Sequence, residues 1–114
     1  MKATDELLER VSNRLKAMAD PMRLKILHTL EDGERTVSEI LEAVGSSQAN
    51  VSKHLALLRK AGLVAARRDG MNVFYRVADD TVFSICRVVC ESLDRYLESE
   101  REMVRRARAA EARS

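Results

Sequence analysis

The stretch Ser-Gln-Ala-Asn-Val-Ser-Lys-His-Leu-Ala-Leu-Leu, residues 47–58, decides the fold. Val51, Leu55 and Leu58 recur at intervals of four and three residues, which places them on one apolar face of a helix. The rest of this helix carries hydrogen-bonding groups and one cation, namely Gln48, Asn50, Ser52, Lys53 and His54. Such side chains suit base edges and phosphates in a DNA major groove. An ordinary amphipathic helix with a solvated face would show the same pattern.

The residues just before this stretch predict a shorter helix over about 37–44. Its apolar positions are Val37, Ile40, Leu41 and Val44. Gly45 and two serines then supply a turn and an N-cap for the longer helix, which Ala61-Gly62 ends. Helix, turn and polar-faced helix together are the outline of a helix-turn-helix.

Two further amphipathic helices precede this pair. The first spans about residues 4–18, with Thr4 as a plausible N-cap and an apolar stripe made of Leu7, Leu8, Val11, Leu15 and Met18. Asp20-Pro21 breaks it and opens a second helix over about 21–30, which Asp32-Gly33 ends. The third helix then begins at Thr36 or Ser38.

After Gly62 the period of the pattern changes from helix to strand. Residues 64–68 and 72–77 read as two short strands joined by the turn Asp69-Gly70-Met71-Asn72. A hairpin directly after a recognition helix is typical of a wing, and its Arg67, Arg68 and Asn72 would then face the DNA backbone or minor groove. The alternative is a hairpin that only covers the core.

The last predicted helix is long, from Asp79 or Asp80, one of which caps it, to about Ala110. It carries a stripe at heptad spacing, made of Phe83, Cys86, Cys90, Leu93 and Leu97. A second stripe follows from Val82, Ile85, Val89 and Tyr96. Because one small domain needs only one of these stripes, the pattern predicts a homodimer through the last helix and the first. The arginine-rich end beyond residue 101 is expected to be a frayed, solvated tail.

The amino-acid composition limits the classes of protein to which the chain can belong. The 114 residues suffice for one domain, 1–114, and with 46% hydrophobic, 33% charged and 4% aromatic residues they predict a mainly helical globular chain with a small β-hairpin. The net charge is only +2, but residues 51–77 hold six Lys or Arg against one acid. No apolar run suggests a signal peptide or membrane span, so we expect a cytoplasmic protein without a membrane partner. No phosphate loop or catalytic triad pattern indicates an enzyme.

Several of these motifs together resemble the ArsR/SmtB family of bacterial winged helix-turn-helix repressors. The resemblance covers about residues 11–97. It rests on Ala19-Asp20-Pro21-Met22-Arg23-Leu24-Lys25-Ile26-Leu27, on residues 47–55, and on Leu58-Arg59-Lys60-Ala61-Gly62-Leu63-Val64. It implies a homodimeric repressor that binds an inverted-repeat operator in double-stranded DNA and leaves it when an inducer binds. The implied DNA contacts are Gln48, Asn50, Ser52, Lys53 and His54, with wing contacts near Arg67, Arg68 and Asn72.

The chain departs from the family at its better-known sensor sites. The region that holds Cys-Val-Cys in many metal-sensing members reads Glu34-Arg35-Thr36-Val37-Ser38-Glu39 here. The last helix has Asp80 but none of the histidines of zinc-sensing members, because the two histidines are His28 and His54. No thiol elsewhere can pair with one in the last helix, as in sulfide-sensing members.

What remains is the pair Cys86 and Cys90, the only cysteines of the chain. Four residues apart on a helix, their thiols share one face, with Cα atoms about 6 Å apart. Soft thiolates bind metal(loid) ions such as arsenite, and a persulfide or disulfide modification is the competing chemistry. No cofactor is otherwise required. The alternatives are a winged-helix dimer whose cysteines only pack, with no thiol inducer, and an adaptor that binds protein instead of DNA.

Overall fold

The computed structural model describes residues 2–113. The elements follow one another as α1 (Asp5–Met18), α2 (Pro21–Thr29), β1 (Arg35–Thr36), α3 (Val37–Val44), α4 (Gln48–Lys60), β2 (Val64–Asp69), β3 (Asn72–Val77) and α5 (Thr81–Arg113). They form two compact units, Met1–Val82 and Phe83–Ser114. The first unit contains the helix-turn-helix and the sheet, and the second consists of most of α5. The predicted fold class, mainly helical with a small hairpin, is confirmed.

Side-chain caps fix the start of each helix before α5. Thr4, Asp20 and Ser47 accept hydrogen bonds from the backbone N–H groups of Leu7, Arg23 and Asn50, respectively. At α3, Thr36 accepts from the N–H of Glu39, and the Glu39 carboxylate accepts from the N–H of Thr36 at 2.9 Å. This reciprocal pair is a capping box, and such a cap contributes about 1 kcal/mol to helix stability. It identifies Thr36, and not Ser38, as the residue that begins the third helix.

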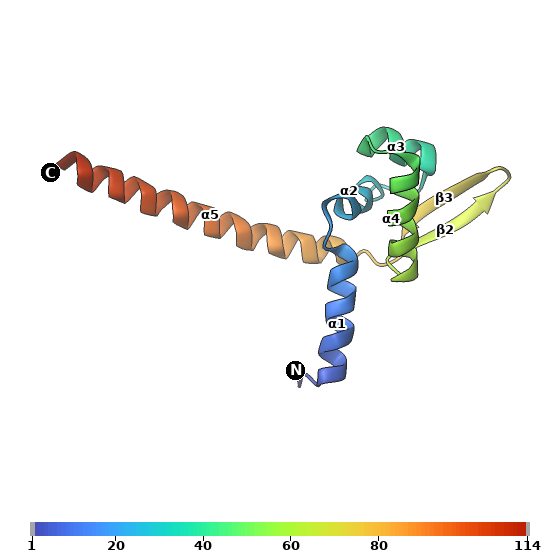
Figure 1. The fold of residues 1–114 in the computed structure, drawn as a ribbon, viewed down its shortest axis with the longest axis horizontal. Coiled ribbons are helices and arrows are strands. Elements are labelled where there is room, and N and C mark those ends of the chain that lie inside the picture. The colour runs from blue at the N-terminus through green and yellow to red at the C-terminus, as the bar shows by residue number, and fades with distance from the viewer. Residues whose placement is uncertain (1, 114) are drawn as a thin grey trace. The chain divides into compact units, whose positions relative to one another are not determined.

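The turn between α3 and α4 depends on a left-handed glycine. Gly45 has φ +68°, and its N–H donates to the Leu41 carbonyl at 2.9 Å. A residue with a Cβ is strained in that conformation, so glycine ends the helix at the lowest cost. Ser46 and Ser47 then lead directly into α4, and this short connection holds the two helices of the motif together (Figure 1).

Three antiparallel strands form the sheet, in the order β1-β3-β2. The β2–β3 register pairs Val64 with Val77 and Asp69 with Asn72, so Gly70 and Met71 alone make the turn. Gly70 has φ +63°, and no non-glycine residue among those described has a positive φ, which is the pattern of a type II′ hairpin turn. The sequence predicted both of these strands. It did not predict β1, whose two residues pair with Phe74 and Tyr75.

The core of the first unit lies where α2, α3 and α4 meet. Its largest fully buried side chains are Ile26, Leu27, Ile40, Leu55, Leu58, Leu63, Val51 and Val82. These apolar side chains come from every helix of the motif, from the residue before β2 and from the first turn of α5. Burying them drives the helices together, since apolar burial is the dominant favourable contribution to folding. The core therefore fixes which face of α4 remains exposed.

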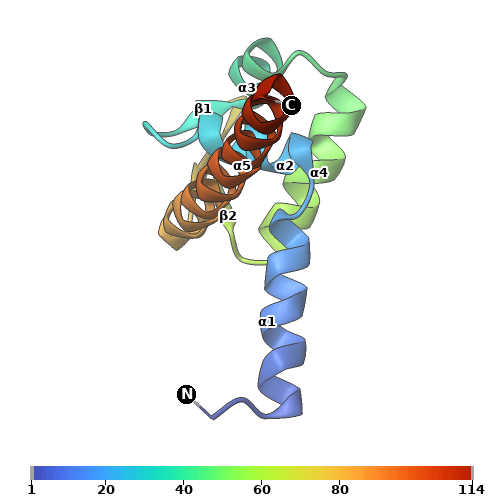
Figure 2. The same ribbon diagram turned by 90° about the vertical axis from the view of Figure 1, so that its left-hand side faces the viewer.

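The helix α1 packs against α2 and α4, and its last turns lie at the C-terminal end of α4 (Figure 2). Arg14 on α1 donates to the Ala61 carbonyl at 3.3 Å and to the Asp79 carboxylate at 2.7 Å. Its apolar stripe is nevertheless open to solvent, because Leu8, Val11 and Leu15 are 50%, 42% and 47% exposed. One protomer alone leaves this face uncovered.

The helix α5 runs from Thr81 to Arg113, three residues beyond its predicted end. The sequence predicted a frayed, solvated tail after residue 101. The tail is not frayed, because the helix continues through it, but its residues are almost all exposed, as expected. Arginines there pair with glutamates one turn away, with Arg101–Glu98 at 3.3 Å and Arg106–Glu102 at 3.1 Å. Such pairs at i,i+3 and i,i+4 each support a helix by a few tenths of a kcal/mol. Within residues 2–113, no helix combines the length and the apolar character needed to cross a lipid bilayer.

Candidate nucleic-acid interface

The exposed side of α4 presents the predicted polar groups. Val51, Leu55 and Leu58 are buried, whereas Gln48, Ser52 and Lys53 are exposed. The buried row is therefore the one that the sequence predicted, and it orients the hydrogen-bonding row outward. The helix has 13 residues, a length that fits a major groove.

Asn50 lies at the edge of this exposed side. Its amide Nδ2 donates to the Ser46 hydroxyl at 2.9 Å, and its backbone N–H donates to the Ser47 hydroxyl at 3.1 Å. The side chain is half-buried, so it is tied to the turn while its amide oxygen keeps acceptor capacity. Asn50 thus both supports the turn and borders the polar surface.

The wing lies beside α4 (Figure 1). Side chains of α4 and of β3 line a shallow hollow between them. This hollow has a volume of about 350 Å³, and its lining residues are Ser52, Leu55, Ala56, Arg59, Lys60 and Tyr75. Two cations and two hydroxyl-bearing side chains among its lining residues are suited to an anionic phosphate. Sequence reasoning counted Arg59 and Lys60 only as part of a basic patch. It missed Tyr75, which only the fold brings to α4.

Arg67, at the middle of β2, is held by carboxylates. Its Nε and Nη2 donate to the two oxygens of Glu34 at 2.8 and 2.9 Å, and Asp69 lies 3.7 Å away. The guanidinium also lies over the Phe74 ring, 4.6 Å from its centroid. Its hydrogen bond lowers the pKa of the Glu34 carboxyl and raises the pKa of Arg67 itself. Arg67 is nevertheless exposed, as are Arg68 and Asn72 nearer the tip.

Comparison with known proteins places the chain in a family. Residues 20–66 match the model of the bacterial regulatory proteins of the arsR family. An uncharacterized HTH-type transcriptional regulator of Methanocaldococcus jannaschii is 40% identical over 87 residues, which cover 75% of this chain and 98% of that protein. The chain belongs to the ArsR family.

Two further relatives of this ArsR-family protein bear on its function. A probable mercury resistance operon repressor of Streptomyces lividans is 49% identical over 67 residues, 59% of this chain and 54% of that protein. The homodimeric winged helix-turn-helix domain of a possible ArsR-family regulator from Mycobacterium bovis has a TM-score of 0.70 at 37% identity, and the match covers 84% of this chain and 92% of that domain. The protein is therefore a winged helix-turn-helix DNA-binding transcriptional regulator.

His54 has a different setting from the other predicted contacts of this ArsR-family protein. Its side chain is buried, with 8% of the residue exposed, and it faces the interior between α2 and α4. Nδ1 lies 3.2 Å from Arg23 Nη1, and Nε2 lies 3.9 Å from the Asp20 carboxylate. A side chain in this position cannot reach a base edge without leaving the core. The prediction that His54 is exposed rested on the polar character of histidine and not on the position of residue 54 around the helix.

The two cysteines of the ArsR-family chain lie on the second unit, in α5. Cys86 is half-buried and Cys90 is exposed, and neither forms a disulfide in the described chain. Among residues 2–113, no three His, Cys, Asp or Glu side chains of one protomer are grouped to hold a metal ion.

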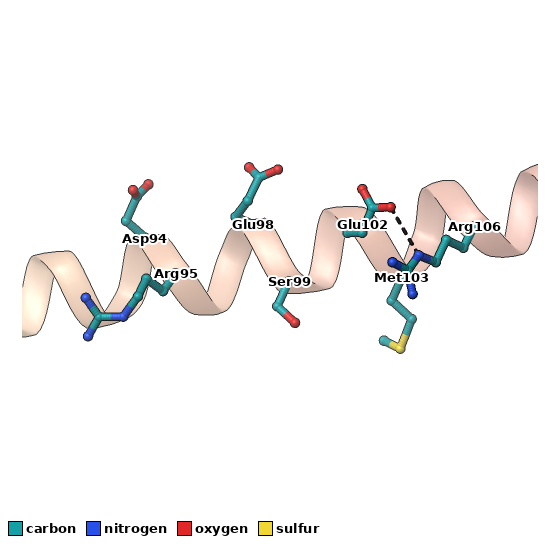
Figure 3. Close-up of a pocket in the computed structure, with 7 residues that line it drawn as sticks. All are labelled: Asp94, Arg95, Glu98, Ser99, Glu102, Met103 and Arg106. Atoms are coloured by element: carbon teal, nitrogen blue, oxygen red, sulfur yellow. Dashed lines mark hydrogen bonds and ion pairs between the residues drawn. The ribbon is translucent and has the colours of Figure 1, made fainter.

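One hollow on α5 is a groove along this single helix. Figure 3 shows its lining side chains projecting from successive turns of α5, with the ion pair between Glu102 and Arg106 at one end. No other element contributes to it. Charged side chains alternate along this groove, so it offers no enclosed or strongly apolar chamber for a small molecule.

Proposed function

We propose that the protein is a homodimeric, cytoplasmic repressor that reads an inverted-repeat operator with α4 and the wing of each protomer. The observation that carries this proposal is the exposed polar side of α4, which lies opposite Val51, Leu55 and Leu58 and beside the basic hollow. A twofold dimer presents two such helices to successive turns of the major groove, and its target is then palindromic.

The open apolar stripe of α1 supports the dimer. Leu8, Val11 and Leu15 are each more than 40% exposed on one face, and α5 leaves Leu93 and Leu97 open as well. Contiguous apolar surface of this kind is typical of protein interfaces. The M. bovis domain, with 37% identity, is homodimeric. A second copy of this chain is therefore the expected partner of these faces.

The residues of the interface divide into readers and anchors in this proposal. Gln48, Asn50 and Ser52 carry hydrogen-bonding groups for base edges, and Lys53 pairs with phosphate. Arg68 and Asn72 provide the wing contact, with Arg67 behind them in its pair with Glu34. Arg59 and Lys60 border the hollow that suits a further phosphate. His54 is left out of the contact set because it is buried.

Removal of one reader and of one anchor tests this division. Gln48→Ala should relax the base preference measured by selection from a randomised duplex library, whereas Lys53→Ala should weaken binding to all duplexes about equally. Lys53→Ala should also reduce the slope of log affinity against log salt by about 1 per protomer. Lys16→Ala, which removes an exposed cation on α1, serves as the control. If the Gln48→Ala protein selected the same sites with unchanged preference, α4 would not be the reading element.

We further propose that the inducer acts at Cys86 and Cys90, either a soft metal(loid) ion or a reactive sulfur species. Their i,i+4 spacing on α5 and the exposure of Cys90 support this proposal. The S. lividans relative is a probable mercury resistance repressor, and soft ions of that class bind thiolates. In the sulfur reaction, the two thiols lose two electrons and two protons to form a sulfur bridge, and the polysulfide that accepts them is reduced to sulfide. Either event at the dimer seam would shift the geometry between protomers and lower operator affinity.

The double variant Cys86→Ser and Cys90→Ser separates this proposal from a packing role. It should bind operator as the wild type does before treatment. Mercuric ion, arsenite, cadmium, zinc and polysulfide are then added one at a time, and operator release is followed by fluorescence anisotropy. At least one reagent should lower wild-type affinity by roughly 5–150-fold and leave the double variant unchanged. An equal response of both proteins would show that the cysteines only pack.

A further inference from the structure

The guanidinium of Arg23, on α2, links two other helices. Its Nε donates to the Ala17 carbonyl at 2.7 Å and its Nη2 donates to the Lys16 carbonyl at 3.2 Å, both in the last turn of α1. Its Nη1 donates to Nδ1 of His54, on α4, at 3.2 Å. One planar guanidinium group thus connects the end of α1 to the middle of α4. We call these contacts the Arg23 bridge.

The chemistry of the bridge fixes the tautomer of His54. Arginine only donates hydrogen bonds, so Nδ1 must be the acceptor and the ring proton lies on Nε2. Nε2 is directed toward Asp20, whose carboxylate lies 3.9 Å away. Asp20 in turn caps α2, accepting the backbone N–H of Arg23 at 3.0 Å, and this hydrogen bond lowers the pKa of its carboxyl. The imidazole therefore lies between two residues at the start of α2, hydrogen-bonded to Arg23 on one side and 3.9 Å from the Asp20 carboxylate on the other.

We propose that His54 contributes to operator recognition as a positioning residue, by fixing the rotation of α4 through the Arg23 bridge, and not as a contact to DNA. This inference rests on the proposed reading role of α4. Side chains project outward from the helix axis. A small rotation of α4 about that axis therefore moves the tips of Gln48 and Ser52 relative to base edges. The apolar contacts that bury α4 are non-directional, whereas a hydrogen bond depends steeply on angle. The Arg23 bridge therefore adds a directional restraint on this rotation to the one that packing of the core already provides.

The location of the bridge gives it a second consequence. It attaches α4 to α1, the helix whose exposed stripe is expected to form the dimer interface. The bridge therefore fixes the orientation of each reading helix relative to that interface. Without the bridge, the dimer would still form, but its two reading helices would sample a wider range of angles.

The test compares two substitutions of His54 in the full-length protein. His54→Asn keeps an acceptor on the atom that follows Cγ, close to the position of Nδ1, whereas His54→Leu removes it. Affinity is measured for an operator duplex selected by the wild-type protein and for a scrambled duplex of the same length at the same salt. His54→Leu should lose about tenfold in operator affinity, while its affinity for scrambled DNA, which depends on phosphate contacts, changes less than twofold. His54→Asn should stay within about threefold of the wild type on both duplexes.

Controls separate positioning from folding. His28→Leu, the same change at the exposed histidine of α2, should leave both affinities unchanged. In a double-mutant cycle with Arg23→Lys, which keeps the charge but not the fork of donors, the losses from Arg23→Lys and His54→Leu should be non-additive.

Three results would overturn the inference. They are an unchanged ratio of operator to scrambled affinity in His54→Leu, a parallel loss on both duplexes with a lowered unfolding temperature, and an equal loss in His54→Asn. A wild-type protein that selects no sequence at all would instead remove the proposed function on which the inference rests.

Discussion

Asp79 connects α1 to the start of α5 through one carboxylate. It accepts a hydrogen bond from Arg14 of α1 at 2.7 Å, and from the backbone N–H and the hydroxyl of Thr81 at 3.1 and 2.6 Å. Arg14 also reaches the Ala61 carbonyl at the end of α4. The sequence offered Asp79 and Asp80 as alternative caps of α5, and the structure shows that Asp79 makes the capping bonds. These bonds to Thr81, followed by the bond to Arg14, lower the pKa of Asp79 to about 2.

Replacement of Asp79 should therefore destabilise the protein in a pH-dependent way. The carboxyl has a lower pKa in the folded chain than its usual value of 3.8, so its contribution to stability is complete above about pH 4 and is lost as the pH falls through about 2. Asp79→Asn should lower the free energy of unfolding at pH 7, and this difference from the wild type should shrink steadily below pH 4. Urea titrations at several pH values measure it. Asp80→Asn is the control, and a deficit that is the same at pH 7 and pH 2 would contradict the role of the charge.

His54 shows what sequence reasoning could and could not predict at single residues. Positions 51, 55 and 58 were placed correctly on the buried face from their apolar character. Position 54 borders this face in helical phase, three residues after 51 and four before 58, and such spacing is typical of a buried face. Its polarity suggested exposure instead. The partner that makes burial acceptable, Arg23, comes from another helix, and a linear pattern does not reveal it.

The wing shows the same limit for elements. Both long strands and the turn were predicted, because alternating side chains and Asp-Gly are local signals. The strand β1 has only two residues and exists because β3 pairs with it, so it has no local signal of its own. The loop that precedes β1 also brings Glu34 to Arg67. Neither this pairing nor the resulting difference between Arg67 and Arg68 could be read from the adjacent letters Arg-Arg.

The two wing arginines should consequently differ when each is removed. Arg68→Ala should lower the salt slope of DNA binding by about 1 per protomer, since it removes an exposed cation that lies free for phosphate. Arg67→Ala should change that slope little and should lower thermal stability, because it removes the bidentate pair with Glu34 and the contact with Phe74. Affinity at four salt concentrations and thermal unfolding of both variants provide the comparison. If Arg67→Ala changed the salt slope more than Arg68→Ala, then Arg67 and not Arg68 would be the phosphate contact.

For the whole molecule, the informative feature is apolar surface that one chain does not bury. Periodicity predicted stripes on the first and last helices, and the structure leaves much of both exposed. The predicted stripe of α5 begins at Phe83 and Cys86, which are half-buried, and continues to Leu93 and Leu97, which are 53% and 42% exposed. Sequence patterns could thus indicate that a partner is needed. They could not fix the angle between two protomers, since that angle depends on packing between chains.

A charge placed on the α1 stripe should therefore separate the protomers. Leu15 is 47% exposed in one chain, and burial of a glutamate there without a partner would cost several kcal/mol at an interface. Leu15→Glu should be monomeric at micromolar concentration in sedimentation velocity and should lose at least about a hundredfold in operator affinity, because one protomer holds only half of the contacts. Asn13→Glu, an exposed position on the opposite side of α1, introduces the same charge and should remain dimeric. If Leu15→Glu stayed a dimer with full operator affinity, the stripe of α1 would not be the surface that joins the two reading helices.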